Sequence, residues 1–496
     1  MKSLLYIIPL ALALGSCSDD FLNHYPKGQW HHGNYKPNDS IDNSILAEGK
    51  IIQSYDNFKS FDFCFTSSAM NSYITPDAEK GGGSLTDGGE GAPSFPTMSF
   101  TSSTNMFYMC YSNYYNAIFK CNEGIALAST ITDKNKDKKD KLMAEALFVR
   151  SLAYFKLIQS FGDVPYVDRV LSQGENTPPR TSSEEIFTVI KKDLAWAIPY
   201  LSTRESNNSS GNKGRATQNA ARALLAKIYL YQNDWSNVLS MTSAIIASGD
   251  NNLSTAFSDI FKEEHEFGPE SILEINAEFK PDEKVYLGTQ NTQIQGIRGV
   301  PNVGWGFNAP SYELINSFEE GDPRKEVTVI ADGDTFDGKK VYGDGYHTYW
   351  NGKVCWNVIT ESRIHGRSIN DQGQWKNIML IRYADILLMH AEAALETGDI
   401  DEALDKLELI RSRARGNNTE ILPKITERNV EILREKIRQE RRIELAMEYD
   451  RYFDLVRWGV AKDMIPGFVK GKHELFPIPQ VEIDKSNGIL TQNPNY

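Results

Sequence analysis

Outside its N-terminus the sequence has no apolar run long enough to cross a bilayer, so we expect the body of the protein to fold in water. Positive charge is also in short supply, because 53 Lys and Arg face 66 Asp and Glu and leave a net charge of −13. A general nucleic-acid groove needs a basic surface, so this balance argues against nucleic acid as a partner. Aromatic residues are plentiful, with 23 Tyr, 23 Phe and 8 Trp, which leaves some for a binding surface.

The signatures of common enzyme classes are missing too. The sequence contains no HExxH, GxSxG or Walker motif, and no Cys–His arrangement with a local activating partner. Gly81-Gly82-Gly83 lacks the strand, the helix and the Lys-Ser/Thr pair of a phosphate-binding loop. These absences favour a protein without catalytic activity and without a cofactor. A glycoside hydrolase stays open, because its two carboxylates follow no local sequence pattern and Asp and Glu are abundant.

Cysteine is scarce and scattered. The cysteines beyond Cys17 form no CxxC pair, which argues against zinc and redox chemistry; they are Cys64, Cys110, Cys121 and Cys355. Their even number permits disulfides. Cys110 and Cys121 stand about three helical turns apart, so we do not expect them to bridge within one helix.

The N-terminus has the pattern of a bacterial lipoprotein signal. The apolar run from Leu4 to Leu14 is too short for a spanning helix and suits a signal peptide. Leu14-Gly15-Ser16-Cys17 then resembles a lipobox, whose cysteine thiol is diacylated and becomes residue one of the mature protein. We predict a signal peptide over residues 1–16, palmitate-type lipid on Cys17 and a polar tether over residues 17–40. Cleavage beside an unmodified cysteine is the alternative, but the small residues Gly15 and Ser16 and the polar chain that follows favour lipidation. Several acyl chains would anchor the protein durably.

Helical periodicity covers much of the remaining chain. The clearest stretch, Glu440 to Trp458, combines an apolar strip with charges at helical spacing; the strip is Leu445, Tyr449, Tyr452 and Val456, and the charges are Arg441, Glu444, Glu448 and Arg451. We expect one helix, stopped by Gly459, with a half-buried Arg–Glu ladder. Further helices are predicted over Met106–Thr130, Lys141–Phe161, Ser182 to near Leu201, and Gly214–Trp235.

The sequence contains an internal repeat. A shift of 165 residues lays Ala226, Leu230, Asp234, Leu239 and Ile245 onto Ala391, Leu395, Asp399, Leu404 and Ile410. In each copy a small residue on one helix precedes a turn with Asp and a second helix rich in Leu and Ile. This spacing is typical of tetratricopeptide helix pairs, in which Ala permits close approach.

The block between the two repeats, residues 268–373, reads as non-helical apart from one segment. Ser271–Ala277 is a strand candidate, and Ser311–Arg324 is predicted to be a helix ending at Gly321. Three Asp-Gly pairs after Val327 predict tight turns between short strands. The residues Asp332, Asp334 and Asp337 suggest a calcium loop, but Phe336 occupies a ligand position and no Glu closes the loop, so we predict no metal.

Several segments resemble the SusD/RagB family of outer-membrane nutrient-binding lipoproteins. They are ERRIELAMEYDRYFDLVRWG ending at Gly459, LFPIP at Leu475–Pro479, the terminal QNPNY, FEEGDPR ending at Arg324, and GDVP at Gly162–Pro165. The resemblance implies a mainly α protein: a tetratricopeptide-like scaffold of helix pairs, with loop-rich, partly β insertions that form the ligand-binding face. It implies one helical half over residues 41–267 and another over 268–496, with the turn-rich insertion at 268–373.

The resemblance also implies a function. Family members are surface-tethered proteins without catalytic activity that capture an oligosaccharide or polysaccharide and cap a SusC-like TonB-dependent transporter in the outer membrane. The lipid on Cys17 would hold such a lid near its transporter at high effective concentration, and the large acidic helical surface would dock on it. Ser18-Asp19-Asp20 resembles the signal for export to the cell surface in Bacteroidetes lipoproteins.

A sugar site needs exposed aromatic rings for the flat C–H faces and polar groups for the hydroxyls. Aromatic residues in irregular segments are the candidates, because helical ones belong more often to the core. The aromatic candidates are Tyr73, Phe95, Trp305, Phe307, Tyr346, Tyr349, Trp350 and Trp356, and the polar ones are Asn71, Asp77, Arg298, Asn302 and Asn351. We expect Trp305 and Trp350 to be the main stacking pair.

In a second hypothesis the protein still caps a transporter, but its ligand is a peptide instead of a glycan. A pocket for peptide termini would favour charged side chains over stacked tryptophans, so binding to mixtures of glycans and peptides separates the two.

Overall fold

The computed structural model describes residues 43–132, 135–280, 284–346 and 348–496. The predictions of a signal peptide, a lipidated Cys17 and a tether lie outside these residues. Among the described helices, none is both long enough and apolar enough to cross a bilayer.

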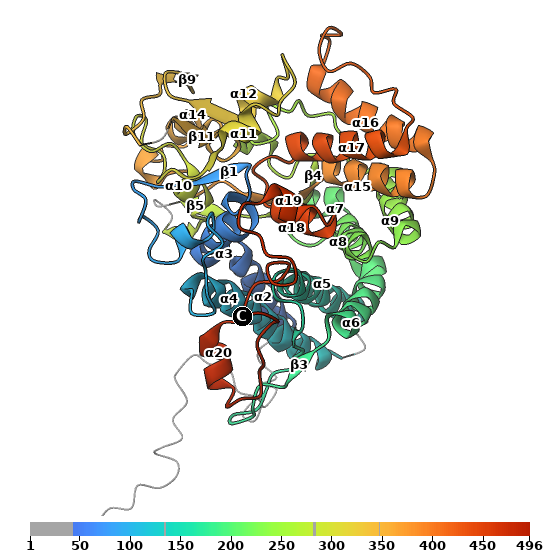
Figure 1. Ribbon diagram of the computed structural model, residues 1–496. Helices are drawn as coiled ribbons and strands as arrows, with labels where there is room; N and C mark the ends of the chain where they lie inside the picture. Colours follow the sequence, from blue (N-terminus) through green and yellow to red (C-terminus); the bar gives the residue numbers. More distant parts are fainter. Residues whose placement is uncertain (1–42, 133–134, 281–283, 347) are drawn as a thin grey trace, which may run out of the picture.

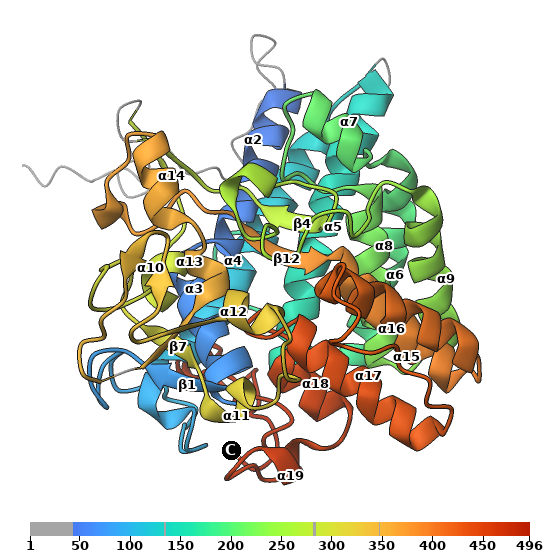
Figure 2. The same cartoon turned by 90° about the horizontal axis from the view of Figure 1, so that it is seen from above.

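Helices form most of the molecule and follow one another around an arc when the protein is seen from above (Figure 2). Each packs on the next, from α4 through α5, α6, α8, α9 and α15 to α16. The larger helices are α2 Asn43–Tyr55, α3 Phe61–Ser67, α4 Asn105–Ser129, α5 Lys136–Phe161, α6 Ser183–Ala197, α7 Arg204–Ser209, α8 Gln218–Tyr231, α9 Trp235–Ser248, α15 Tyr383–Glu396, α16 Ile400–Arg415, α17 Val430–Glu444 and α18 Arg451–Arg457; short α19 Ala461–Met464 and α20 Gln480–Lys485 follow. The predicted mainly α fold is confirmed.

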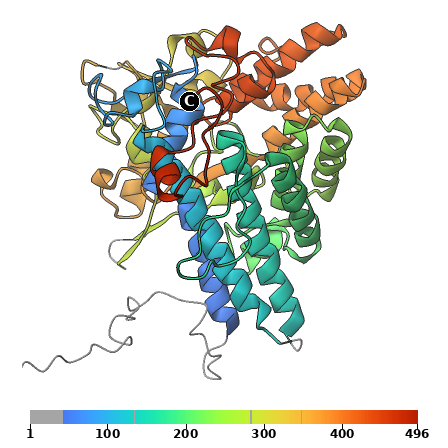
Figure 3. The same cartoon turned by 60° about the horizontal axis from the view of Figure 1, so that its bottom comes forward.

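The long helices α2, α4 and α5 lie side by side and form the base of the scaffold (Figure 3). α4 agrees with its predicted bounds to within one residue, whereas α5 begins five residues earlier than predicted, inside a run of charged side chains. α6 begins as predicted, because the Ser182 side chain accepts a hydrogen bond from the backbone N–H of Glu185.

The internal repeat is confirmed in three dimensions. Asp234 caps α9 by accepting from the Asn237 N–H, and Asp399 caps α16 by accepting from the Glu402 N–H. The two caps share nearly the same backbone angles, with φ of −86° and −88°. Ala226 and Ala391 are fully buried in the first helix of each pair, so neighbouring helices approach closely there.

The expected single helix from Glu440 to Trp458 is wrong. α17 ends at Glu444 and α18 starts at Arg451, because Met447 and Tyr449 adopt positive φ angles of 66° and 70°. Such angles cost about 1 kcal/mol each for these residues. The break turns the Glu448 carboxylate toward Lys353 and the Tyr449 hydroxyl toward Asn291, and both contacts stabilise it.

The Arg–Glu ladder therefore does not run along one helix. Its charges pair with other elements, and they are more deeply buried than predicted: Glu444 is 0% exposed and Arg441 2%. Glu444 accepts hydrogen bonds from Arg382, Arg324 and Arg413. Arg441 pairs with Asp385 and Asp454 instead of Glu444. These buried ion pairs join α17 to β12, to α15 and to the insertion that precedes β12 in the sequence.

The insertion lies beside the arc rather than in it (Figure 1). It contains two-stranded antiparallel sheets and short helices: β4 Ser271–Ile275, β5 Glu278–Lys280, β6 Val285–Leu287, α10 Asn291–Gln295, β7 Phe307–Pro310, α11 Tyr312–Ile315, α12 Arg324–Thr328, β8 Val329–Ala331, β9 Thr335–Phe336, β10 Lys339–Lys340, β11 Tyr349–Asn351, α13 Gly352–Cys355 and α14 Val358–Ile364. β12 Ile378–Arg382 follows the insertion and pairs with β4. Within the insertion the other strand pairs are β5–β6, β8–β11 and β9–β10. Outside it, the short strands β2 Val164–Pro165 and β3 Arg180–Thr181 pair with each other. The predicted strand at Ser271 and the Asp337-Gly338 turn are confirmed.

The predicted helix over Ser311–Arg324 is wrong in length. Ser311 caps α11, but this helix ends at Ile315 after one turn. Gly321 then takes a φ of +76°, and Arg324 opens a separate helix from a buried pair with Asp322, Nη2 to Oδ2 2.8 Å. The helix is therefore interrupted at Gly321, and Asp322 and Arg324 after it are both buried.

The insertion has a small core of its own. Buried side chains there include Ile330, Phe336, Val341 and Trp350, and they form a cluster separate from the main helical core. Cys355 belongs to it, whereas Cys64, Cys110 and Cys121 are buried in the helical part. All four are free thiols, so the permitted disulfides do not form. The division of the chain into halves at residue 268 stays a prediction.

Candidate functional site

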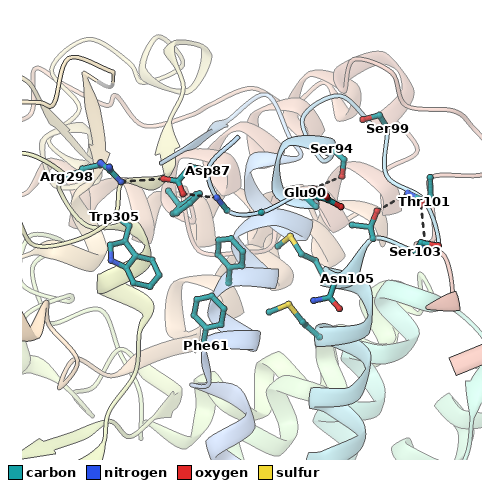
Figure 4. Close-up of a pocket in the computed structure, with 18 residues that line it drawn as sticks. Phe61, Asp87, Glu90, Ser94, Ser99, Thr101, Ser103, Asn105, Arg298 and Trp305 are labelled. Atoms are coloured by element: carbon teal, nitrogen blue, oxygen red, sulfur yellow. Dashed lines mark hydrogen bonds and ion pairs between the residues drawn. The ribbon is translucent and has the colours of Figure 1, made fainter. Parts of the chain in front are cut away.

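A pocket of about 960 Å³ opens where α3, the loop before α4 and the segment before β7 meet. Figure 4 shows Trp305, Arg298 and Asp87 toward one end of it and Ser99, Thr101 and Ser103 toward the other. Its lining is Phe61, Phe65, Asp87, Gly88, Gly89, Glu90, Gly91, Ser94, Ser99, Thr101, Ser103, Thr104, Asn105, Met106, Met109, Arg298, Trp305 and Phe307. Apolar rings thus share the cavity with hydroxyl, amide and charged groups.

Four aromatic rings form one wall. Phe61 stacks on Phe65 with centroids 5.2 Å apart, and Phe65 meets Phe307 edge to face at 5.3 Å. Trp305 lies 6.3 Å from Phe61 at a steep angle. All four rings line the cavity, Phe65 and Phe307 as buried side chains and Phe61 and Trp305 as half-buried ones. The exposed parts of these two rings suit stacking against the apolar face of a ligand.

Backbone contacts hold Trp305 and Phe307 in place. β1, Ala78–Gly81, pairs antiparallel with β7, which sets Gly81 opposite Phe307. A Cβ on Gly81 would lie 2.0 Å from the Gly306 carbonyl oxygen, so only glycine allows the two segments to come this close. The Trp305 N–H donates to the Gln293 carbonyl at 2.7 Å. Trp305 and Phe307 in the aromatic wall are therefore held by main-chain hydrogen bonds.

A buried lysine organises the loop that carries Asp87. The Lys80 ammonium donates to the carbonyls of Gly81, Ser84 and Asp87 at 2.8, 3.0 and 3.0 Å. Burial lowers the pKa of Lys80, and the Asp87 carboxylate opposes that shift. Asp87 in turn accepts from the N–H groups of Gly83 and Gly88 at 2.6 and 2.9 Å. The loop therefore presents a preformed carboxylate to the pocket.

The charges in the pocket leave no uncompensated cation. Arg298, the one basic residue in the lining, pairs with Asp87 at 3.5 Å and with Asp344 at 2.9 Å. Glu90 adds an exposed carboxylate. A neutral ligand rich in hydroxyls suits this balance, because carboxylate, guanidinium and amide groups bind hydroxyls without demanding a charge on the ligand. Among the described residues, no group of three or more His, Cys, Asp and Glu is arranged to hold a metal ion.

The structure brings three of the sequence candidates together in this pocket: Arg298, Trp305 and Phe307. Others lie in the interior, where a ligand does not reach them as the chain is folded; these are Asn71, Tyr73, Asp77, Phe95, Trp350 and Asn351. Asp77 there pairs with Arg442 and Arg451. Tyr349 and Trp356 are half-buried, and Asn302 and Tyr346 are exposed, but none of these four lines the pocket.

The expected pair of Trp305 and Trp350 is thus separated. Trp350 is 0% exposed and packs in the core of the insertion, while Trp305 lines the pocket. Phe61, which contacts Trp305 edge to face in the same wall, is the ring that sequence reasoning missed. Phe61 and Phe65 are four residues apart, so they share one face of α3; the same spacing also describes a core face, and periodicity alone does not separate the two.

Two family models match the chain. The model described as "SusD family" matches residues 269–474, and the one described as "Starch-binding associating with outer membrane" matches residues 95–230. Together they cover more than half of the chain.

Relatives agree along most of the length. A SusD-like protein of Bacteroides ovatus is 26% identical over 92% of this chain and 83% of its own. Among solved structures, a laminarin binding SusD-like protein is 27% identical with a TM-score of 0.75, covering 92% of this chain and 100% of that chain. Surface glycan-binding protein A from Bacteroides fluxus is 26% identical with a TM-score of 0.75, covering 91% and 99%. The resemblance read from the sequence is confirmed, and the chain belongs to the SusD/RagB family of non-catalytic glycan-binding proteins.

Proposed function

We propose that this protein captures a neutral glycan at the cell surface, in the pocket lined by Trp305, Phe61 and Asn105, and delivers it to a TonB-dependent outer-membrane transporter. The observation that carries the proposal is the pocket itself: half-buried aromatic rings on one wall, with hydroxyl, amide and paired charged groups around them. This combination matches the amphipathic surface of a sugar ring. The names of the relatives support it, since one is a laminarin binding protein and another a surface glycan-binding protein.

The lid and anchor roles rest on sequence. A lipid on Cys17 would tether the folded body to the outer membrane through residues 17–40, and the net charge of −13 provides an acidic surface for a SusC-like partner. The family description, "associating with outer membrane", supports this location.

The anchor is tested by a single substitution. Replacing Cys17 with alanine removes the acylated thiol, so we expect most of the variant to leave the membrane fraction and become soluble. Fractionation of cells with antibody detection measures this. A variant that stays in the membrane fraction as fully as the parent contradicts lipidation at Cys17.

The glycan is tested with two matched ligands: a neutral gluco-oligosaccharide, and the same oligosaccharide oxidised at C6 to uronic acids. The pocket contains Asp87 and Glu90, and its only guanidinium is already paired, so we expect the oxidised ligand to bind about tenfold more weakly at low salt, near 1.4 kcal/mol. Titration calorimetry with the soluble form that begins after Cys17 measures the affinity for both ligands. The difference between the two affinities should decrease as salt screens the carboxylates.

The peptide alternative is examined by measuring which members of glycan and peptide mixtures the protein retains. A mixture of random peptides retained by the protein, with no neutral glycan retained, contradicts the proposal. Equal binding of the neutral and oxidised sugars leaves glycan binding intact and contradicts only the preference for neutral ligands.

A further inference from the structure

Lys80 does not line the pocket, yet it contacts two residues that do. It lies in β1 and is only 9% exposed. Its ammonium stands 5.3 Å from the centroid of the Phe307 ring and donates to the backbone carbonyl of Asp87 at 3.0 Å. The lysine therefore links the aromatic wall of the pocket to the loop that carries the Asp87 carboxylate.

The loop after β1 folds around this charge. Lys80 donates to the carbonyls of Gly81 and Ser84 as well as that of Asp87, so the three N–H groups of the ammonium have three oxygen acceptors. A buried charge is costly unless polar groups compensate it, and here the carbonyl dipoles of the loop provide the compensation. One side chain thus holds both the first and the last residue of the loop.

Side-chain packing does little to hold the same loop. Residues 84–86 at its tip are exposed, and Leu85 is 76% exposed. Gly81 and Gly82 have φ angles of +71° and +80°, and glycine loses more conformational freedom than other residues when it is ordered. Without the Lys80 charge, the loop should therefore open locally while the rest of the protein stays folded.

Asp87 transmits such an opening to the pocket. Its carboxylate accepts hydrogen bonds from the N–H groups of Gly83 and Gly88 in the folded loop, and it pairs with Arg298 at 3.5 Å (Figure 4). Asp87 and Arg298 both line the pocket. An open loop would displace the carboxylate from the guanidinium, so these two polar groups would no longer be preorganised for the hydroxyls of a ligand.

We propose that the Lys80 ammonium is a positioning group for glycan binding: its charge keeps the loop from Gly81 to Asp87 folded against the pocket, and loss of that charge lowers the affinity for the glycan. The inference rests on the proposed function and adds to it a residue that controls affinity. Lys80 acts through Asp87 and Phe307, without touching a ligand in the pocket.

The first test replaces Lys80 with methionine, which has a similar length but neither charge nor N–H donors. Affinity for a neutral β-glucan oligosaccharide, measured by titration calorimetry, should fall about tenfold, because binding must then order the loop. Hydrogen exchange followed by mass spectrometry, without ligand, should show faster exchange of the Gly83 and Gly88 N–H groups than in the parent. A lysine that only stabilised the fold would lower the unfolding temperature without this local change.

Lys59→Met is the matched control. Lys59 also donates to two backbone carbonyls, those of Asn276 and Leu287 at 3.0 and 2.9 Å, and its side chain is 11% exposed. None of these three residues lines the pocket. The variant should bind the oligosaccharide within about a factor of two of the parent, and the loop after β1 should exchange as in the parent.

A second measurement needs no variant and follows the affinity of the parent with pH. Burial lowers the pKa of Lys80, while the negative charge of Asp87 opposes this shift. The ammonium is charged below its pKa, so affinity should fall as pH rises from about 7 toward the ordinary lysine pKa of about 10.4. The pocket lining contains no Tyr, Cys or His; the charged groups that face the loop are Asp87, Glu90 and Arg298, with Asp344 beyond Arg298. Lys80→Met should lack this decline.

The inference is overturned if Lys80→Met binds like the parent, if it binds more weakly while the loop exchanges as in the parent, or if Lys59→Met loses as much affinity. Constant affinity of the parent over this pH range overturns it as well, and that result is available even if Lys80→Met does not fold. Failure of the proposed function looks different, because then the parent binds no neutral oligosaccharide at any pH, and the inference falls with it.

Discussion

Replacing Trp305 with alanine is expected to lower glycan affinity by about 30-fold, or ~2 kcal/mol, the usual cost of removing a central aromatic anchor from a binding site. Trp305 is the largest ring in the pocket lining and contacts Phe61 edge to face. The variant should fold, because Trp305 is only half-buried and its backbone hydrogen bond to Gln293 does not involve the side chain. Calorimetric titration with a neutral oligosaccharide measures the loss.

Two variants separate stacking from general damage. Trp305→Phe keeps a smaller ring in the same place and should retain much of the affinity. Trp196→Ala removes a tryptophan that is 38% exposed on α6, a helix that contributes no residue to the pocket, and should bind like the parent. Parent-like binding by Trp305→Ala, or an equal loss in Trp196→Ala, shows that the ligand does not stack where we place it.

The second large effect concerns stability. Glu444 is fully buried and meets three guanidinium groups, those of Arg324, Arg382 and Arg413. Replacing it with glutamine removes the charge and leaves these arginines under-compensated in the interior. We expect the free energy of unfolding to fall by about 3–5 kcal/mol, as happens when one partner of a buried ion pair is removed. Denaturant unfolding followed by tryptophan fluorescence measures it.

The control lies on the same helix. Glu435 pairs with Arg438 at 2.9 Å, but its carboxylate is 70% exposed. Glu435→Gln should therefore change the free energy of unfolding by less than about 0.5 kcal/mol. If the two substitutions destabilise the protein equally, burial of the network is not what makes Glu444 important.

The pH dependence of Glu444→Gln follows from the same contacts. Burial raises the pKa of Glu444, but Arg413, Arg382 and Arg324 outweigh burial and hold this pKa well below its ordinary value. A carboxyl whose pKa is lower in the folded state stabilises fully above the unfolded pKa, about 4.3, and this contribution is lost as pH falls below it. The difference in unfolding free energy between parent and variant should therefore be largest near neutral pH and shrink below about pH 4.

The helical scaffold was predictable because its signals are local. Ser182 and the paired Asp234 and Asp399 cap helices where the sequence placed them, and each cap depends only on residues within one turn. The break inside the Glu440–Trp458 stretch was not predictable. It depends on Lys353 and Asn291, which are distant in sequence and meet Glu448 and Tyr449 only in the folded chain.

Part of the site was also predictable from local sequence. Arg298, Trp305 and Phe307 belong to a glycine-rich irregular segment, and irregular aromatic segments often reach ligands. Trp350 and Phe95 also lie in or beside irregular segments, yet both are fully buried, because the insertion and the first loop pack rings of their own. Phe61, by contrast, lies in helix α3 and lines the pocket. Irregular backbone therefore indicates where a ligand loop lies, but not which side chains face the ligand.

The most direct measurement is a crystal structure of the protein with a neutral β-glucan oligosaccharide. We expect one sugar ring to stack on Trp305, with hydroxyls directed toward Arg298, Asp87 or Asn105. A sugar bound only elsewhere on the surface, with the pocket lined by Trp305 and Phe61 left empty, would contradict the assignment of this pocket as the glycan site.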